Sequence, residues 1–388
     1  MNALVPVPAR RARLSPAVFE AVGYFIPRLL FGDPHIAPKL SWGDIVYALD
    51  GFDESCLDLG SALFWDRWRE AWERRANTHL ARAELARGVA ARSLSLRRAA
   101  ACLHWAEFMY FEDRQCKARL RERVRECFKQ SLTFDGYRMT EYTFTVSGHP
   151  SASTYRYWVL TPARSRSEPW PCALLINGLD SITEVEVLTL GETFLRNGRA
   201  VILFEGPGQG LELGRSALRA DMEMVIAQLL VALAQRRYLD LSDLGLLGVS
   251  FGGYLALRAA HALPDAFGWV VNFSGGPRVR SYQNLPRRLK QDFAYAFGIT
   301  DLARMPELLD SLALPEGSRA SPPILSVHGA FDDIFALADL RAAIASWGGH
   351  HRLEVLEGEA HVCLHELPEC LDLIIDWIST LHTPEAQP

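Results

Sequence analysis

One short segment restricts the possible folds more than any other part of the chain. The apolar run LGLL at 244–247 leads directly into GVSFGG at 248–253, and the helix-like segment YLALRAAHAL follows. A strand that turns this sharply into a helix strains its central residue and brings the two elements close together, so glycine neighbours are needed. The segment therefore predicts a strand, a tight turn at Ser250 and a helix.

Other segments around this unit have the pattern of a sheet covered on both faces. Short apolar runs recur along the chain, namely CALLIN, AVILFE, LGLLGVS, WVVNFSG, PILSVHG and RLEVLEG. The stretches between them are long enough for helices, for example at 219–236 and 253–262, and this alternation is typical of a parallel sheet. Before them, TEYTFTV and STYRYWVLTP alternate polar with β-branched or aromatic residues around the turn-like SGHPSA at 147–152, which predicts an antiparallel pair.

The first third of the chain has a different period. Residues 15–131 carry apolar positions at three- and four-residue spacing, which predicts packed helices, most clearly at 60–76, 78–88, 93–112 and 114–130. Because 388 residues exceed what one hydrophobic core usually serves, we expect two domains. These are a helical cap or lid over 1–131 and an α/β catalytic domain over 132–388.

Composition limits the possible partners and the compartment. With 49% hydrophobic and 22% charged residues the chain is typical of a globular protein, and its net charge of -5 lacks the basic character of a nucleic-acid binder. Proline and glutamate interrupt the apolar stretch at 14–31, so we expect neither a signal peptide nor a membrane span. The negative net charge favours a small molecule as the partner. Seven scattered cysteines without CxxC spacing indicate reduced thiols and therefore a cytoplasmic protein.

The GxSxG pattern alone is weak evidence in a chain with 28 glycines, but a strand before it and a helix after it predict that Ser250 is a nucleophile. A serine needs a base and an orienting carboxylate, and in this arrangement both follow it in the sequence. HGAFDD at 328–333 offers Asp332, preferred over Asp333 because of the HGxxD spacing. A loop after the last predicted strand offers His361 as the base, in preference to His365.

Acyl transfer at Ser250 also needs an oxyanion hole. We expect its N–H donors on Phe251, at the start of the helix, and on Leu179, in the turn after the strand CALLIN. That turn also has a purely structural interpretation, as a helix start capped by Asp180 or Ser181. The spacing of His361, Cys363 and His365 lacks a third liganding cluster, so we expect no metal and no organic cofactor.

Four stretches resemble a known family. NGLDSITE at 177–184, FEGPGQG at 204–210, GVSFGGYLA and GEAHVC at 358–363 are similar to motifs of the FrsA-like α/β-hydrolases, whose members include hydrolases of pseudooxynicotine and of fungal polyketides. The resemblance covers about 140–375. It implies an α/β-hydrolase fold, a triad of Ser250, Asp332 and His361, a cap over the pocket, and often a homodimer.

Some positions depart from the family pattern. Asp180 stands where the pseudooxynicotine hydrolase carries a glutamate that assists carbon–carbon cleavage, and its shorter side chain leaves open whether it acts on substrate or caps a helix. Asn177 replaces a glycine, and Glu205 and Leu211 replace the acids that flank GPGQG.

Two kinds of bond are compatible with these residues. We expect a serine hydrolase that cleaves a carbon–carbon bond next to a ketone, or an ester, in an aromatic or polyketide-like secondary metabolite. A plain carboxylesterase or thioesterase, an acyltransferase or cyclase with the same triad, and an inactive binding module are the alternatives. Tryptophan and other aromatic residues on 60–76 and 93–112 fit either the core of the cap or a wall of the pocket.

Overall fold

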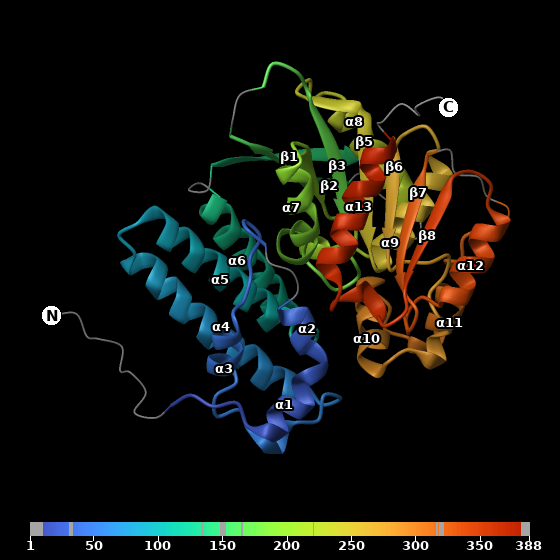
Figure 1. Cartoon of the computed structure of the whole chain (residues 1–388). Helices are drawn as coiled ribbons and strands as arrows, with labels where there is room; N and C mark the ends of the chain where they lie inside the picture. The colour runs from blue at the N-terminus through green and yellow to red at the C-terminus, as the bar shows by residue number, and fades with distance from the viewer. Residues whose placement is uncertain are drawn as a thin grey trace.

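An eight-stranded sheet forms the centre of the C-terminal two thirds of the chain (Figure 1). The computed structural model describes residues 11–30, 34–132, 136–147, 153–163, 166–219, 221–315, 317 and 322–381. The strands lie in the order β1-β2-β4-β3-β5-β6-β7-β8. Their bounds are β1 Tyr137–Val146, β2 Ser153–Pro162, β3 Trp170–Ile176, β4 Ala200–Phe204, β5 Leu239–Val249, β6 Trp269–Phe273, β7 Ile324–Gly329 and β8 His351–Leu356.

Most of the apolar runs of the sequence are strands that helices cover on both faces. The edge strand β8 is the exception, because it is only partly buried and Arg352 on it is exposed. In β3, Cys172, Leu174 and Ile176 pack into one core, and Ala173 and Leu175 pack into the other. Helices α7 (Leu188–Arg196) and α13 (Leu367–Leu381) cover the front face in Figure 1, and α8 (Met222–Leu233), α9 (Phe251–Ala262) and α12 (Leu337–Ser346) cover the opposite face. This double burial explains why these strands are apolar at nearly every position.

The edge of the sheet has the antiparallel strands that the alternating segments predict. β1 pairs antiparallel with β2, and β2 pairs antiparallel with β4, whereas β4, β3, β5, β6, β7 and β8 run parallel. The expected turn SGHPSA lies outside the described residues except for Ser147. Together with the covering helices, this mixed sheet is the α/β-hydrolase fold that the sequence predicts.

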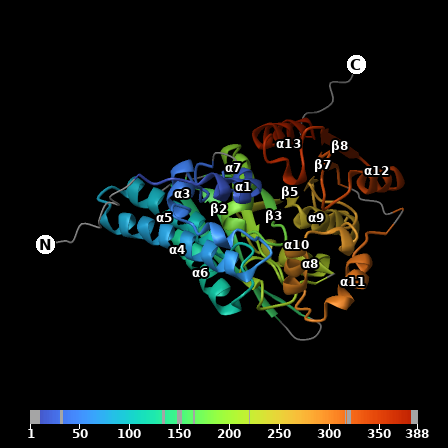
Figure 2. The ribbon, with the colours of Figure 1, turned by 90° about the horizontal axis from the view of Figure 1, so that it is seen from below.

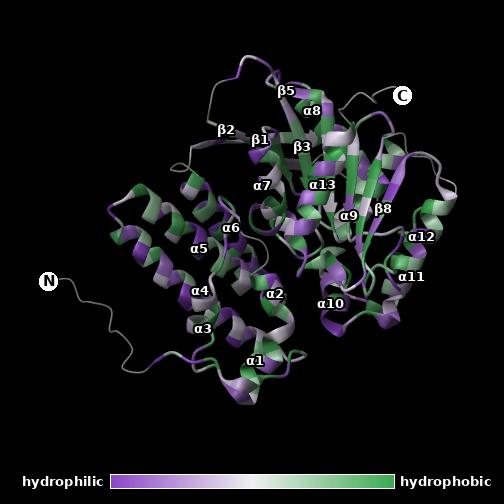
Figure 3. Cartoon of the chain, in the orientation of Figure 1, coloured by the Kyte–Doolittle hydropathy of each residue, from purple (hydrophilic) through white to green (hydrophobic). Residues whose placement is uncertain are grey.

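The first third of the chain is helical, as expected. Its helices are α1 Pro16–Val22, α2 Ile26–Leu29, α3 Trp42–Ala48, α4 Ala62–Leu85, α5 Val89–Glu107 and α6 Arg114–Leu132. The two helices predicted at 60–76 and 78–88 are one helix, because no glycine or proline interrupts the segment after Ser61, whose hydroxyl caps it. Figure 3 shows hydrophilic and hydrophobic residues interspersed along these helices, as expected for helices that pack on one face.

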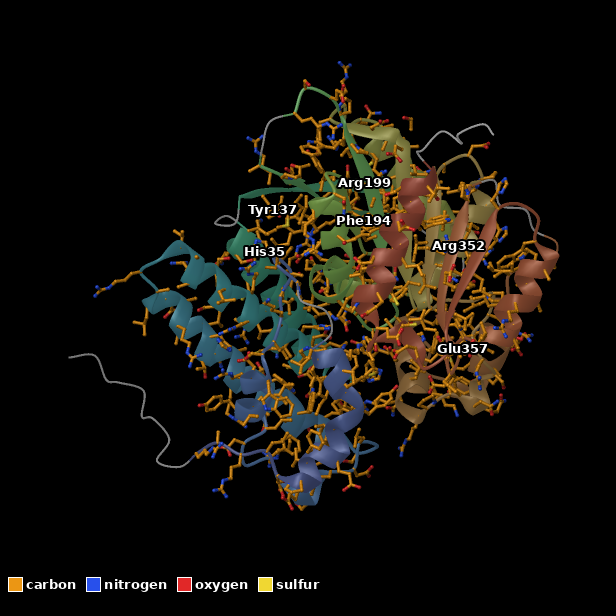
Figure 4. The ribbon with its side chains drawn as sticks, viewed as in Figure 1. His35, Tyr137, Phe194, Arg199, Arg352 and Glu357 are labelled. Atoms are coloured by element: carbon orange, nitrogen blue, oxygen red, sulfur yellow. The ribbon has the colours of Figure 1, made fainter. Side chains whose placement is uncertain are left out.

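The helical region packs along one side of the α/β region in both Figure 1 and Figure 2. Ile182 and Val185 of the α/β region belong to the apolar core of the helical region. A carboxylate strengthens this contact, because Glu192 of α7 accepts hydrogen bonds from the backbone N–H groups of His35, at 2.6 Å, and Ile36, at 2.7 Å. His35 accordingly lies at the seam between the two regions in Figure 4.

The thiols belong to the packing of the molecule. All seven cysteines are free, and six of them are buried. Buried free cysteine behaves as a small apolar side chain. Within the part of the chain that the structure describes, no helix has the length and apolar character needed to cross a bilayer.

Two further helices belong to the α/β region. α10 (Arg287–Ala296) and α11 (Met305–Ser311) lie between β6 and β7 in the chain. Arg288 of α10 donates hydrogen bonds to the Met109 carbonyl and to the Glu112 carboxylate, both in the turn between α5 and α6. These bonds connect α10 to the helical region.

Candidate active site

Ser250 lies on the sharp turn between β5 and α9. Its backbone has φ 58° and ψ -122°, a conformation that residues other than glycine rarely adopt. The glycines around it are required by close approach, since a Cβ on Gly248 would lie 2.0 Å from the Gly252 carbonyl oxygen, and one on Gly252 would lie 2.4 Å from the Ile176 oxygen. The hydroxyl therefore stands at the carboxyl end of the sheet, at the N-terminus of a helix.

The structure brings the expected base to this hydroxyl. His361, in the loop after β8, places Nε2 2.8 Å from Ser250 Oγ and Nδ1 2.7 Å from Asp332 Oδ2. The next residue, Val362, has φ 68° and donates its N–H to Ser274 Oγ at 3.0 Å. This hydrogen bond holds the loop, so the imidazole ring bridges the serine and the carboxylate.

The buried acid is Asp332, not its neighbour. Its Oδ1 accepts hydrogen bonds from the N–H groups of Ile334, at 2.9 Å, and Phe335, at 2.8 Å, which leaves Oδ2 for His361. Burial alone would raise the pKa of this carboxyl, but the charge of His361 and these hydrogen bonds outweigh it and lower the pKa. Asp333 is exposed.

The turn after β3 lies directly against the serine. A Cβ on Gly178 would lie 3.3 Å from Ser250 Cβ, a tight contact, so the turn packs closely against the serine. The side-chain amide of Gln209, in the GPGQG segment, donates to the carbonyls of Asn177 at 2.8 Å and Gly178 at 3.3 Å. This arrangement holds Gly178, the residue before Leu179, against Ser250.

The interpretation of Asp180 as a helix cap is wrong. The helical turn after it begins at Thr183, with Ile182 at the N-cap position and no side-chain cap. Instead, the Asp180 carboxylate receives two hydrogen bonds from the Arg28 guanidinium of α2, at 2.8 Å and 3.2 Å. The residue therefore joins the helical region to the turn that carries Leu179.

Several residues that hold this turn were not found from the sequence. Arg28 also bonds the buried Glu186 at 2.7 Å, and Arg121 of α6 donates to the carbonyls of Asp180 and Gly210. Glu205, the departure from the family pattern, accepts from the Thr183 N–H at 3.0 Å and from the Leu211 N–H at 2.8 Å. Glu205 stands next to the GPGQG motif, which is a sequence signal for its role. Arg28 and Arg121 lie on helices far away in the sequence, and no motif marks them.

The competing histidine and the aromatic residues lie elsewhere. The His365 side chain is 70% exposed and pairs with Glu359 at 3.2 Å. Six aromatic residues of α4, α5 and the following turn are buried in the core of the helical region: Trp65, Trp68, Trp72, Trp105, Phe108 and Tyr110. The core interpretation therefore holds for these six, whereas Phe111 is half-buried and packs its ring 5.2 Å from that of Tyr295 in α10.

This fold places the chain among the α/β-hydrolases of the serine-hydrolase type. A model of the family "Esterase FrsA-like" matches residues 63–284, more than half of the chain, and a model of the prolyl oligopeptidase family matches residues 221–381. The chain belongs to the FrsA-like esterase family and is a hydrolase.

Relatives within curated proteins are also hydrolases. The 2,6-dihydropseudooxynicotine hydrolase of Paenarthrobacter nicotinovorans is 26% identical over 84% of this chain and 88% of its own length. Hydrolyase poxO of Penicillium oxalicum is 41% identical over 25% of each chain, and 20-hydroxy-prefusarin hydrolase FUS2 of Gibberella moniliformis is 44% identical over 23% of each. The match thus spans only about a quarter of these two fungal proteins.

Solved structures share the fold over most of the chain. The 2,6-dihydroxy-pseudo-oxynicotine hydrolase superposes with a TM-score of 0.72 at 20% identity, covering 88% of this chain and 93% of the other. AbyA5 superposes with a TM-score of 0.64 at 22% identity, covering 81% and 84%. At these identities the likeness shows a shared fold, and it extends into the helical region that precedes the sheet in the sequence.

Proposed function

We propose that the protein hydrolyses a small ketone or ester substrate through an acyl-enzyme on Ser250. The observation that carries this proposal is the chain of two short hydrogen bonds, 2.8 Å from Ser250 Oγ to His361 Nε2 and 2.7 Å from His361 Nδ1 to Asp332 Oδ2. Such a chain lets the imidazole remove the serine proton while the carboxylate orients the ring and stabilises its charged form.

In this mechanism Ser250 Oγ attacks the substrate carbonyl carbon as His361 takes its proton. In this proposal the N–H groups of Phe251 and Leu179 hold the oxyanion that forms. Phe251 begins α9 directly after Ser250, and Leu179 follows Gly178, which packs against Ser250. The bond to the leaving group then breaks, and His361 returns the proton to that group. Water, activated by the same imidazole, releases the acid.

A carbon–carbon bond next to a ketone is our preferred target. This choice rests on the likeness to the 2,6-dihydropseudooxynicotine hydrolase over 84% of the chain and on the resemblance of NGLDSITE to the motif of that hydrolase. A plain ester is the second candidate, supported by the family description as an esterase. We further propose that residues 1–131 act as a cap over the site and that 132–388 form the catalytic domain.

The cysteines and the family resemblance indicate the compartment, the substrate class and the assembly of the enzyme. Free cysteines are typical of a reducing compartment, so we infer that the enzyme acts in the cytoplasm. The family resemblance leads us to propose a secondary metabolite of aromatic or polyketide type as its substrate. Homodimer formation remains an expectation drawn from the family resemblance. Gel filtration with light scattering measures it directly.

The deciding experiment compares two substrates that share one acyl group. One is an aryl 1,3-diketone and the other is the p-nitrophenyl ester, with products identified by mass spectrometry. We expect turnover of both by the wild-type protein and of neither by Ser250→Ala. Cleavage of the ester alone would reject the carbon–carbon proposal and leave the esterase, whereas unchanged turnover by Ser250→Ala would reject both.

A further inference from the structure

Arg121 of α6 is a buried arginine that uses all three nitrogens of its guanidinium group. Its side chain is 1% exposed. Nε donates to Glu107 Oε2 at 3.0 Å, Nη2 donates to the Asp180 carbonyl at 3.2 Å, and Nη1 donates to the Gly210 carbonyl. A buried charge is costly unless it is paired and hydrogen-bonded, and these three bonds meet that need. Two of the three partners lie outside the helical region, in the α/β region.

The two carbonyls that Arg121 binds belong to different segments of the α/β region. Asp180 lies in the turn after β3 and directly follows Leu179, whereas Gly210 directly follows Gln209 of the GPGQG segment. A guanidinium group is planar and presents its N–H groups in a fixed fork, so it sets the separation of the two carbonyls that it binds. Arg121 therefore ties the turn after β3 to the GPGQG segment.

Gln209 links these two segments to the Leu179 N–H. The Gln209 side-chain amide donates to the Gly178 carbonyl at 3.3 Å. This carbonyl and the Leu179 N–H belong to one peptide group, and in a planar trans peptide they point in opposite directions. The bond from Gln209 therefore fixes the direction of the Leu179 N–H. Because Arg121 holds the residue after Leu179 and the residue after Gln209, it keeps the two ends of this bond in register.

Glu205 joins the same two segments through their N–H groups. Its Oε1 accepts a hydrogen bond from the Thr183 N–H at 3.0 Å, and its Oε2 accepts one from the Leu211 N–H at 2.8 Å. Arg121 thus binds one carbonyl of each segment, and Glu205 binds one N–H of each. Burial alone would lower the pKa of the Arg121 guanidinium, but the charges of Glu107 and Glu205 outweigh it and raise the pKa, so Arg121 stays charged.

Arg121 is itself anchored within the helical region. Glu107, the last residue of α5, is fully buried, and its Oε2 also accepts a hydrogen bond from Lys117 Nζ at 2.6 Å. Its Oε1 lies 3.0 Å from His104 Nδ1. These contacts fix the carboxylate that orients the Arg121 guanidinium. The packing of α5 and α6 therefore determines where Arg121 holds the two segments.

We propose that Arg121 is a positioning residue of the oxyanion hole, which holds the turn after β3 against the GPGQG segment so that the Leu179 N–H points at the substrate oxyanion. This inference rests on the proposed function, since it takes Leu179 as an oxyanion donor. Donors that are already in place stabilise the transition state without reorganisation as charge develops on the substrate. Arg121 acts only through the backbone of the two segments, so its loss lowers kcat and leaves substrate binding largely intact.

Two variants of Arg121 and one matched control test this role. Arg121→Met removes all three hydrogen bonds, and Arg121→Lys keeps a positive charge beside Glu107 but lacks the fork. Arg125→Met is the control, because Arg125 lies one turn later on α6, is 6% exposed and joins the helical region to Glu141 of β1 by a 2.6 Å hydrogen bond. It therefore loses a comparable buried ion pair between the same two regions, at β1 and not at the turn after β3.

Steady-state kinetics with p-nitrophenyl acetate separates positioning from packing. We expect kcat to fall about 100-fold in Arg121→Met and about 10-fold in Arg121→Lys, with KM within about 3-fold of the wild type. Arg125→Met keeps kcat within about 2-fold, although it also loses stability. Equal losses of kcat in Arg121→Met and Arg125→Met would overturn the inference in favour of a packing role. A raised KM with an intact kcat in Arg121→Met would overturn it in favour of substrate binding.

An aryl trifluoromethyl ketone reports on the oxyanion hole directly. Ser250 Oγ adds to its carbonyl carbon while His361 takes the proton, and the carbonyl oxygen becomes an oxyanion that resembles the transition state. We expect its inhibition constant to rise about 100-fold in Arg121→Met, as much as kcat falls, and to stay unchanged in Arg125→Met. A lowered kcat in Arg121→Met with an unchanged inhibition constant would contradict a role at the oxyanion.

Amide hydrogen exchange followed by mass spectrometry tests the same role without turnover. In Arg121→Met we expect faster exchange than in the wild type for the peptides that cover 177–183 and 206–212, and no change there in Arg125→Met. Unchanged exchange of these peptides in Arg121→Met would overturn the inference, whatever the kinetics show. If the wild type hydrolyses no ester, the proposed hydrolysis fails on its own, and the exchange still decides whether Arg121 holds the turn.

Discussion

Arg28 and Asp180 form an ion pair with hydrogen bonds of 2.8 Å and 3.2 Å across the seam between the helical region and the α/β region. Asp180 directly follows Leu179, one of the two proposed oxyanion donors. The pair links the helical region to the turn after β3 that carries Leu179.

Replacement of Arg28 therefore affects both stability and turnover. Arg28→Leu leaves the carboxylates of Asp180 and Glu186 largely buried without their cation, and we expect a loss of about 3 kcal/mol in the free energy of unfolding. Urea unfolding measures it, and kcat falls in the same variant. Arg67→Leu is the control, because Arg67 is half exposed and pairs only with Glu70, and it costs under about 1 kcal/mol. Equal losses in the two variants would contradict this role.

Gln209 supports the oxyanion turn from its other side. Gln209→Leu removes the hydrogen bonds to the carbonyls of Asn177 and Gly178, so the turn loosens and kcat falls about 100-fold while KM changes little. Steady-state kinetics on the ester substrate measures the change. Gln235→Leu, in the exposed turn after α8, leaves both constants unchanged. A rise in KM with an intact kcat would instead assign Gln209 to substrate binding.

Substitution of each residue distinguishes the role of Asp332 from that of its neighbour Asp333. Asp332→Asn removes the charge that stabilises the His361 imidazolium and disturbs its tautomer, and we expect kcat to fall about 10³- to 10⁴-fold. Asp333→Asn changes an exposed carboxyl and leaves kcat within about 2-fold. Both are measured with the same ester. A large loss confined to the Asp333 variant would reassign the acid.

Stability should depend on pH through Asp292, a fully buried acid of α10 whose pKa burial raises. Its pKa is about 8 in the folded protein and near 4 when unfolded, so the unfolded chain releases this proton first and the contribution of the group to stability falls from about pH 4 to pH 8. Asp292→Asn lacks this slope and has a higher Tm than the wild type at pH 8, with little difference at pH 4. Differential scanning fluorimetry across this range tests it. Parallel pH curves for the two proteins would mean that Asp292 is ionised at neutral pH.

Parts of the site that local sequence determines were predictable. Ser250 was recognisable because a strained turn needs glycines on both sides, and Asp332 and His361 because each follows an apolar strand in a fixed chain order. The apolar runs are recognisable as strands because a parallel sheet is buried on both faces, which makes its strands apolar.

Long-range contacts were not predictable. Arg28 lies about 150 residues before Asp180, and no pattern in either segment indicates the partner. Asp292 looks like an ordinary polar position of an amphipathic helix, yet the structure buries it completely. The sequence predicts two helices at 60–76 and 78–88 where α4 is single, and no glycine or proline ends a helix between them.

The central claim is that Ser250 carries the acyl group. The most direct measurement is rapid quenching of the wild type with the p-nitrophenyl ester, followed by peptide mass spectrometry of the trapped protein, with Ser250→Ala in parallel. We predict one adduct of the acyl mass on the peptide that contains Ser250, and none in the variant. An acyl adduct on another residue, or full turnover by Ser250→Ala without any adduct, would contradict the account.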